Sequence, residues 1–338
     1  SVLNADLWKR SGHYEHYKEN MYFTEIDETR YAIKPMNCPG SFLIYGHRPR
    51  SYRELPLKLA EFGHVHRFEL SGVLHGLLRV RAFTIDDTHI FCTLDQLQQE
   101  IVTILEIAFK VLKKCDFTHI DLALSTRPAK SLGTDTEWDA ATKALEGALT
   151  SFGKPFTLQE GEGAFYGPKI EIVIKDAMGR SWQTGTVQVD FFQAHNFDLS
   201  YVSSAGTHER PVIIHQAIYG SFERFFAILL EHYKGHLPFW LAPVQIRILT
   251  ITDDQMSYAE QLYERFKNAG FRVEVDPSAD KITGKIKSAQ LAKIPWMFVI
   301  GGKEKESGTA SIRYLDGKQE LGLTIETLLE RARELVTL

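Results

Sequence analysis

The stretch EFGHVHRFELSGVLHGLLRVRAFTIDDTHIF, from Glu61 to Phe91, largely decides how the first part of the chain is interpreted. Apolar and polar residues alternate on both sides of Ser71-Gly72, which is typical of two strands joined by a loop. Side chains two residues apart leave the same face of a strand, so cations at that spacing converge and suit a polyphosphate. The stretch therefore predicts a hairpin that binds an anion. Its charged residues are Arg67 and Glu69 before the loop, and Arg79 and Arg81 after it.

Length and composition are those of an ordinary globular protein of about two domains, with 338 residues, 44% hydrophobic and 24% charged. The net charge of -4 gives no bulk signal for a polyanionic partner, which would need a local basic patch. Cys38, Cys92 and Cys115 are too few for a disulfide framework, which favours a reducing compartment such as the cytoplasm. No apolar run reaches the roughly 18 residues of a membrane-spanning helix, so we expect no membrane association.

Glycine and two prolines interrupt an apolar helical pattern between Lys234 and Pro243. We place a domain boundary there, giving domains at residues 1–239 and 240–338. Hairpin-like strands interspersed with helices before it predict an antiparallel sheet with helices packed on it. The strands are expected at Lys169–Lys175 and Trp182–Phe191, and the helices near Leu94–Lys114 and Ser221–Tyr233.

After the boundary, strand and helix patterns alternate along the chain. This predicts a compact α/β module of roughly 100 residues and, with the first domain, an overall α+β fold class. The strands are expected at Val244–Thr252, Phe271–Val275, Trp296–Gly301 and Ala310–Tyr314, and the helices at Asp254–Gly270, Ile282–Lys293 and Thr324–Val336.

A second cluster, Gly220-Ser221-Phe-Glu-Arg224, begins a helix. An arginine gains nothing from the positive end of a helix dipole, so Arg224 indicates an anionic ligand near the helix N-terminus. A surface arginine without a ligand is the alternative, and this motif alone leaves both open.

These two clusters resemble motifs 2 and 3 of class II aminoacyl-tRNA synthetases. Several longer runs, from about Asp6 to the C-terminus, resemble the threonyl-tRNA synthetase family within that class. The runs are Lys34–Gly40 (KPMNCPG), Leu74–Gly76 (LHG), Asp86–Cys92 (DDTHIFC), Gly161–Lys169 (GEGAFYGPK) and Trp182–Phe191 (WQTGTVQVDF). The resemblance implies a class II catalytic domain, an antiparallel sheet flanked by helices, followed by an α/β anticodon-binding domain. We expect most of motif 1 and the N-terminal editing domain to be absent from this chain.

The resemblance also implies one zinc ion per chain, held by Cys38, His89 and His215. Spacing alone favours a buried thiol and two core histidines, because the ligands lack the compact pattern of structural zinc. In the family, threonine fills the open zinc position with its amino and hydroxyl groups. Asp87 is expected to accept the threonine hydroxyl proton, although it could be a capping aspartate. The other expected threonine contacts are Tyr166, for the amino group, and Met36, as a wall.

For ATP with Mg²⁺, the resemblance assigns Arg67 to the substrate carboxylate and α-phosphate, with Arg79 and Arg224 at the far phosphates. Glu69 is expected at the adenine amino group, with the adenine ring stacked on Phe83 and sandwiched on its other side by Arg224. Gln183 and Gln188 are expected at the ribose. Lys169 is expected at the activated carboxylate. His13 is expected either to help deprotonate the tRNA terminal hydroxyl or only to position the nucleotide.

In the second domain, Arg313 and Glu304 match family positions that contact anticodon bases. Lys281 and Lys285 lie one helical turn apart and could follow a phosphate backbone. Residues 241–338 contain 14 basic and 14 acidic side chains by our count of the sequence, so a solvated face remains the alternative.

The implied function is activation of L-threonine with ATP and its transfer to tRNA(Thr), by a protein that is a homodimer at full length. Three residues depart from the family pattern: Ile85 stands where glutamine is usual, and Ser41 and Ala82 replace histidine and glycine. Ile85 and the expected absence of motif 1 keep open a non-catalytic synthetase-like paralogue that binds tRNA or regulates, whereas no consequence is drawn from Ser41 and Ala82. A ligase acting on an acceptor other than tRNA is opposed by the anticodon-like domain.

Overall fold

The computed structural model describes residues 1–337, which form two compact units, Ser1–Leu229 and a second unit from Leu230 onward. The domain boundary expected after residue 239 lies in the segment between the last helix of the first part, ending at His232, and the first strand of the second, beginning at Ile246. That boundary stays a prediction. No described helix is both long enough and apolar enough to span a membrane.

The first unit is built on a seven-stranded sheet with the strand order β4-β5-β12-β9-β8-β6-β7. Neighbouring strands are antiparallel except for β6 and β7, which confirms the predicted antiparallel sheet. The strands are β4 (Leu57–His66), β5 (Ala82–Cys92), β12 (Val212–Ala217), β9 (Ser181–Asp190), β8 (Lys169–Lys175), β6 (Ile120–Ser125) and β7 (Thr157–Gln159).

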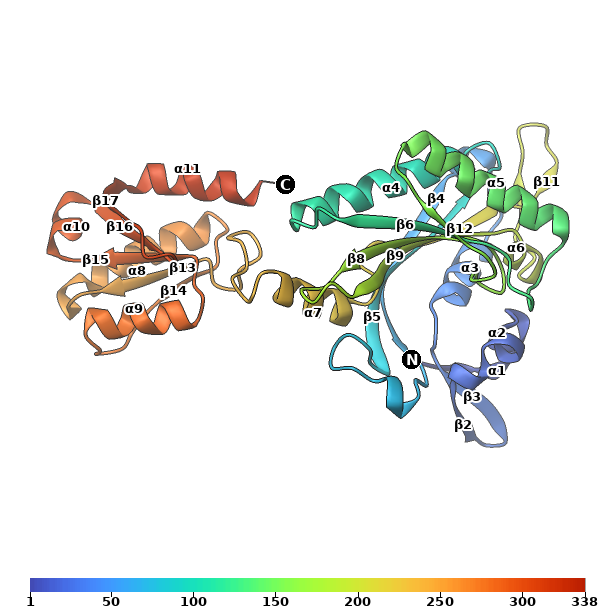
Figure 1. The fold of residues 1–338 in the computed structure, drawn as a ribbon, viewed down its shortest axis with the longest axis horizontal. Helices are drawn as coiled ribbons and strands as arrows, with labels where there is room; N and C mark the ends of the chain where they lie inside the picture. The colour runs from blue at the N-terminus through green and yellow to red at the C-terminus, as the bar shows by residue number, and fades with distance from the viewer. Residues whose placement is uncertain (338) are drawn as a thin grey trace. The chain divides into compact units, whose positions relative to one another are not determined.

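The period-two pattern of the central strands separates a core face from a cavity face. In β8, Ile170, Ile172 and Ile174 are fully buried, whereas Lys169 belongs to the opposite face and lines a cavity. Helices α4 (Leu97–Lys114) and α5 (Asp135–Phe152) pack together, and both contact β9. Figure 1 shows the two helices together along one face of the sheet.

Smaller elements complete the first unit. A three-stranded sheet has the order β1-β3-β2, and β10 pairs with β11. The strands are β1 (Val2–Asn4), β2 (Tyr22–Ile26), β3 (Thr29–Ile33), β10 (Tyr201–Val202) and β11 (His208–Glu209); the helices are α1 (Ala5–Arg10), α2 (His13–His16), α3 (Cys38–Gly46), α6 (Gln193–Asn196) and α7 (Phe222–His232).

The two strands of the predicted hairpin pair with each other, but the loop between them is longer than predicted. Strand β4 ends at His66 and β5 begins at Ala82, so all four charged residues of the predicted hairpin lie in the connection, outside both strands. This connection contains a 3-10 turn at Ser71–Val73, and Arg81 Nε donates to the backbone oxygen of Glu69. Alternation of apolar and polar residues in the connection therefore does not mark strand faces.

The second unit is a five-stranded sheet with the order β14-β13-β15-β16-β17, in which the first three strands are parallel and the last two are antiparallel to their neighbours. It confirms the predicted α/β module but adds β17 and α10, which the sequence patterns did not reveal. The elements are β13 (Ile246–Thr250), α8 (Met256–Asn268), β14 (Val273–Val275), α9 (Ile282–Leu291), β15 (Trp296–Ile300), α10 (Gly302–Ser307), β16 (Thr309–Tyr314), β17 (Gln319–Thr324) and α11 (Ile325–Val336).

Candidate active site

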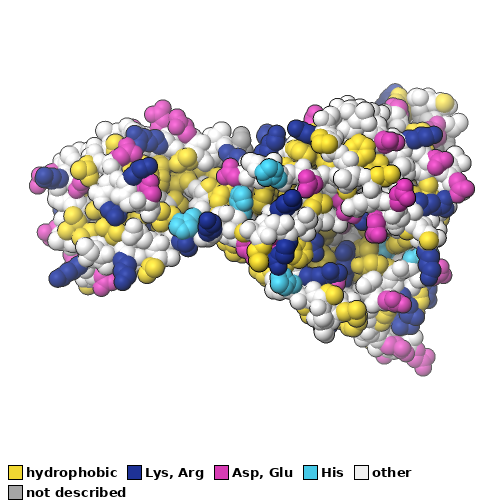
Figure 2. All heavy atoms as spheres, viewed as in Figure 1, with side chains coloured by type: hydrophobic (Ala, Val, Ile, Leu, Met, Phe, Trp, Pro, Cys, Tyr) yellow, Lys and Arg dark blue, Asp and Glu magenta, His cyan; other side chains and the backbone are white. Residues whose placement is uncertain are grey.

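A cavity of about 580 Å³ lies in the first unit against the cavity face of its sheet. Its wall is strongly basic, with five Lys or Arg side chains against the two carboxylates of Glu69 and Asp87. The basic residues are Arg67, Arg79, Lys130, Lys169 and Arg224. Figure 2 shows Lys and Arg side chains inside the hollow on the visible face of the larger unit. Such an excess of cations in a concave site attracts an anionic ligand.

Arginines form one end of this cavity. Arg224, on the first turn of α7, donates from Nε to the Leu78 backbone oxygen at 2.8 Å and from Nη1 to that of Gln183 at 3.0 Å. Arg67 donates from Nε to the Pro35 backbone oxygen at 3.2 Å. Backbone carbonyls thus fix two guanidinium groups while leaving further N–H donors for a ligand.

The charges at this end are only partly compensated. Arg79 pairs with Glu69 at 3.0 Å, and both residues line the cavity. Burial lowers the pKa of Arg224, and the positive charges of Arg79 and Arg67 lower it further, whereas Glu69 opposes them. An arginine stays charged despite such a shift, so the free energy of this end falls when an anion binds.

One expectation for the arginine end needs correction. Arg81 is absent from the cavity wall because its guanidinium bonds the Glu69 backbone and Ser71. Arg67 lies over the Phe83 ring at 5.1 Å from the ring centroid, and Arg224 lies over Trp182 at 5.4 Å. Phe83 and Arg224 both line the cavity, and the expected sandwich of the adenine ring between them stays a prediction.

Asp86 holds the turn before α7 against β5, a role that the sequence patterns did not reveal. Its carboxylate accepts hydrogen bonds of 2.8 to 2.9 Å from the backbone N–H groups of Ile218, Tyr219 and Gly220. Glu223 adds a second tie, because both its carboxylate oxygens accept from the Thr84 N–H at 3.0 Å. Two partly buried carboxylates thereby fix where α7 begins and where it places its arginine.

Removal of this anchor gives a stability prediction. We expect Asp86→Ala to lower the free energy of unfolding by about 2 to 4 kcal/mol, because three partly buried N–H groups lose their acceptor. Burial raises the pKa of Asp86 to about 6, against the effect of the three donors, so urea unfolding should be measured at pH 8, where the carboxylate is charged. The exposed Asp139 on α5 provides the control, Asp139→Ala. Equal stability of the two variants would contradict the anchoring role.

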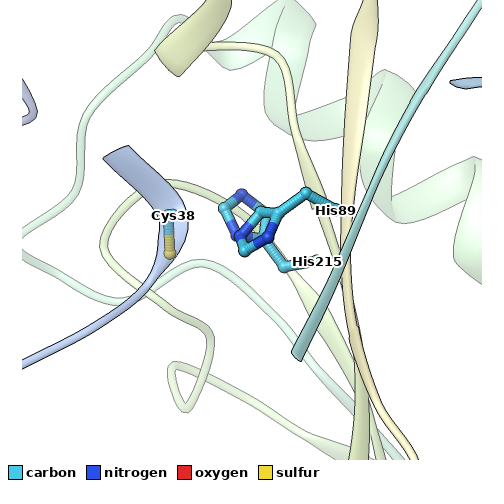
Figure 3. A group of neighbouring side chains, drawn as sticks. All are labelled: Cys38, His89 and His215. Carbon is cyan, nitrogen blue, oxygen red and sulfur yellow. The ribbon is translucent and has the colours of Figure 1, made fainter. Parts of the chain in front are cut away.

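Cys38 and His215 also line the cavity, and His89 forms a cluster with them. Their sulfur and nitrogen atoms lie within 4.8 Å of one another, and all three residues are buried. His89 and His215 are direct cross-strand neighbours on β5 and β12, and Cys38 begins α3. Figure 3 shows both imidazole rings extending from the two strands toward Cys38. The fold thus brings together residues that are far apart in sequence.

The hydrogen bonds of this cluster leave its facing atoms available. Ser41 Oγ lies 3.2 Å from His89 Nδ1, and Asp190 Oδ2 lies 2.9 Å from His215 Nε2. The opposite ring atoms, His89 Nε2 and His215 Nδ1, are buried and have no hydrogen-bond partner among the described residues.

The chemistry of these donor atoms fits a zinc ion. Burial opposes ionisation of the Cys38 thiol, but the nearby His215 and His89 outweigh it and hold the pKa of the thiol well below its ordinary value. Burial lowers the pKa of His215, but Cys38 and Asp190 outweigh it and raise the pKa to about 10, so binding of a metal would release an imidazole proton. A thiolate and two imidazoles that are neutral once a metal binds, each oriented through its other nitrogen, are a zinc ligand set with its supporting shell. The two unpartnered ring nitrogens are explained if an ion binds between them.

Asp87, Tyr166 and Met36 line the same cavity, and their expected contacts with threonine stay predictions. Tyr166 donates from its hydroxyl to Gln188 Oε1 at 2.5 Å, and its ring lies 4.9 Å from that of His215. Gln188 is also the register partner of His215. Gln188 therefore lies beside the Cys–His cluster while it also lines the cavity, and its expected contact with the ribose stays a prediction.

His13 does not line the cavity. It is 1% exposed, with Nδ1 lying 2.7 Å from Ser11 Oγ and Nε2 lying 3.0 Å from Met36 Sδ. The arrangement favours a positioning role through Met36, while the general-base role stays a prediction. His16, which sequence reasoning missed, lines the cavity and stacks on Phe165.

Lys169 lines the cavity and pairs with Glu171 at 2.6 Å. Gln183 lines it as well, beside Arg224. Of the seven residues expected to bind ATP, all reach the cavity wall: Arg67, Glu69, Arg79, Phe83, Gln183, Gln188 and Arg224. Their individual contacts with ATP stay predictions.

The expected anticodon residues of the second unit differ in accessibility. Lys281 is exposed, but Lys285 is only 3% exposed and donates from Nζ to Thr250 Oγ1, so the expected pair on one phosphate-binding face is wrong. Glu304 accepts from the Gly301 N–H and the Ser311 hydroxyl, which engages both of its oxygens. Arg313 Nε is a buried donor without a partner among residues 1–337.

On its visible face, the second unit is covered neither by basic side chains alone nor by acidic ones alone. Figure 2 shows basic and acidic side chains interspersed there, in keeping with the balanced charge of this part of the sequence.

Comparison with known proteins agrees with this geometry. Residues 22–233 match the family described as "tRNA synthetase class II core domain (G, H, P, S and T)", and residues 245–335 match "Anticodon binding domain". The threonine–tRNA ligase of Desulfosudis oleivorans is 50% identical over 333 residues, covering 98% of this chain and 52% of that protein. The ligase of Caldanaerobacter subterraneus is 53% identical over 312 residues, covering 92% and 48%. The chain thus spans about half the length of these curated relatives.

A solved structure is similar over nearly the whole chain. The structure described as the RNA binding domain of threonyl-tRNA synthetase from Cryptosporidium parvum has a TM-score of 0.94 and 44% identity, with 99% of this chain and 84% of that chain covered. A putative threonyl-tRNA synthetase from Aeropyrum pernix has a TM-score of 0.81 and 31% identity, with 99% and 80% covered. The chain belongs to the threonyl-tRNA synthetase family of the class II synthetases, with a core domain followed by an anticodon-binding domain.

Proposed function

We propose that this chain is the catalytic and anticodon-binding part of a threonine–tRNA ligase, which activates L-threonine with ATP and transfers it to tRNA(Thr). One observation carries the proposal: a single cavity is lined by three arginines and by Cys38 and His215, two members of the Cys–His cluster that His89 completes. The arginines suit a polyphosphate, and the cluster suits a metal that binds a small amino acid.

Zinc is the proposed metal, held by Cys38, His89 and His215. When bound, it would supply an open coordination position for the amino and hydroxyl groups of threonine. The protein contributes Asp87, whose carboxylate can accept the hydroxyl hydrogen, and Tyr166, whose ring lies 4.9 Å from that of His215. Valine has no hydroxyl, so its binding would leave these buried polar groups unpaired, which discriminates far more strongly than shape.

In the proposed first step, the threonine carboxylate attacks the α-phosphate of ATP, which carries Mg²⁺, and pyrophosphate leaves. The reaction needs positioning and charge stabilisation more than a protein nucleophile. Arg67 would bridge the carboxylate and the α-phosphate, Arg79 and Arg224 would hold the β- and γ-phosphates, and Lys169 would stabilise the carboxylate end. The arginine-rich wall of the cavity supports this assignment.

In the proposed second step, a terminal hydroxyl of the tRNA attacks the threonyl carbonyl and AMP leaves. Because His13 contacts the cavity residue Met36, we assign it the positioning of that wall. In the second unit, Arg313 is the proposed contact with an anticodon base, since its buried Nε–H has no partner among the described residues.

Arg313 gives a prediction that separates the two units. We expect Arg313→Ala to lower the rate of charging at limiting tRNA about tenfold, through loss of a base contact worth about 1–3 kcal/mol. Pyrophosphate exchange, which needs no tRNA, should be unchanged. Arg333→Ala, at an exposed position on α11, is the control for both assays. Normal charging by Arg313→Ala would rule out the proposed contact.

We also propose that the full-length protein is a cytoplasmic homodimer. Strand β4 is an edge of the seven-stranded sheet, and Phe62 on it is 77% exposed, which is the kind of edge that proteins pair or cover. The three cysteines are free and buried, as is usual in a reducing compartment.

Aminoacylation tests the whole proposal. Labelled threonine, ATP and a tRNA(Thr) transcript should yield acid-insoluble threonyl-tRNA, whereas a tRNA with another anticodon should not be charged efficiently. Tight binding of tRNA(Thr) without charging, by a chain shown to contain zinc, would instead support a non-catalytic tRNA-binding paralogue.

A further inference from the structure

Asn37, just before α3, is the buried neighbour of the carboxylate that faces the cavity. Its side chain is 2% exposed, and its Nδ2 donates to Asp87 Oδ2 at 2.9 Å. Its Oδ1 is a buried acceptor with no hydrogen-bond partner among the described residues. A buried acceptor without a partner destabilises a fold, and such groups in native proteins call for an explanation.

The Asn37 amide lies in the space that Gly63 on β4 leaves open because it has no side chain. A Cβ atom at Gly63 would stand 2.2 Å from Nδ2, 2.3 Å from Oδ1 and 2.4 Å from Cγ of Asn37. Gly63 is not among the glycines with a positive φ, so its backbone conformation is open to other residues. Space for the amide, rather than a special turn, therefore requires glycine at this point of a regular strand.

The hydrogen bond from the Asn37 side-chain amide determines which carboxylate oxygen of Asp87 remains free. Oδ2 is taken by Asn37, while Oδ1 lies 3.7 Å from His89 Nδ1, an atom already 3.2 Å from Ser41 Oγ. The carboxylate is thus held from one side and presents Oδ1 for a further donor. Because Asp87 lines the cavity, the orientation of its carboxylate is the orientation that a ligand meets.

We propose that Asn37 is a positioning residue for amino-acid recognition: it fixes the Asp87 carboxylate so that one oxygen accepts the substrate hydroxyl, and Gly63 makes room for it. This inference rests on the proposed function and deepens it. It predicts that Asn37 and Gly63 act on the choice of amino acid, whereas ATP binding depends on the arginine end of the cavity.

The test uses two variants that disrupt the Asn37–Asp87 hydrogen bond in different ways. Asn37→Asp keeps the shape of the side chain but replaces the donor by an acceptor, and Gly63→Ala leaves every polar group in place but displaces the amide. Gly40→Ala is the matched control, because a Cβ there meets nothing within 4 Å and its φ is ordinary. Zinc content and thermal unfolding are measured on each variant to establish that it is folded.

We expect both variants to raise the KM for threonine about 10- to 100-fold in pyrophosphate exchange and to lower the preference for threonine over valine by a similar factor. The KM for ATP and the zinc content should stay at the parent values, and Gly40→Ala should match the parent throughout. If Gly63→Ala does not fold, Asn37→Asp alone decides.

Three outcomes would overturn the inference. A folded Asn37→Asp variant with parental threonine KM and parental selectivity would show that the amide does not position Asp87. Equal losses for threonine and ATP would indicate a general structural role. Absence of threonine-dependent exchange in the parent chain would remove the proposed function itself and this inference with it.

Discussion

Replacing Cys38 by serine should abolish threonine-dependent activation, with a fall of at least about 1000-fold in kcat/KM for threonine. The reason is the donor set: two unpartnered ring nitrogens and one thiol face one another in a buried pocket, and serine offers no thiolate. Without the metal, the hydroxyl and amino groups of threonine lose the partner that distinguishes them from valine. Metal content by atomic emission should fall with activity.

Cys115 supplies the matched control for this substitution. It is free, buried and outside the cavity wall, so Cys115→Ser should retain zinc and activity. A strong chelator should reproduce the Cys38→Ser defect in the parent chain, and added zinc should reverse it. Full activity of a zinc-free Cys38→Ser protein would contradict the assignment of this cluster to threonine recognition.

Replacing Arg67 by lysine should reduce the rate of pyrophosphate exchange about 100- to 1000-fold. Lysine keeps the charge, but it lacks the planar fork that donates to two acceptors at once. In the structure, one N–H of Arg67 is already used on the Pro35 backbone oxygen, which aims the remaining donors. The loss should fall mainly on kcat, since the bridging contact is strongest in the transition state.

Arg81 is the control for Arg67 because both lie in the same connection. Its guanidinium bonds the Glu69 backbone and Ser71, outside the cavity wall. Arg81→Lys should therefore change the exchange rate little. Similar defects in the two variants would mean that the connection as a whole, and not the Arg67 fork, determines the rate.

Much of the architecture could be predicted because it depends on local patterns. The strand at Lys169–Lys175 was predicted with the bounds that it has, since isoleucines alternate with polar residues there. Helix α5 was missed although its N-terminus carries a Thr134 and Glu137 capping box, a signal that a search for caps would have found.

The candidate site also has a part that could be predicted and a part that could not. Resemblance brought Cys38, His89 and His215 together in the prediction, whereas their spacing alone gave no reason to do so. The supporting contacts of Ser41, Asp190 and Asn37 depend on which side chains meet across the fold, and no periodicity in a sequence encodes that. The predicted phosphate-binding face at Lys285 was wrong for a similar reason. That face of the helix was expected to be exposed to solvent, but it packs against β13 and Lys285 bonds Thr250.

Whether the cavity selects threonine through zinc can be measured by pyrophosphate exchange with each of the amino acids in turn, with zinc content determined on the same sample. We expect exchange with threonine, weaker exchange with serine because it lacks only a methyl group, and none above background with valine, at one zinc ion per chain. Exchange that favours valine over threonine, or threonine exchange by a fully zinc-free protein, would contradict this selection through zinc.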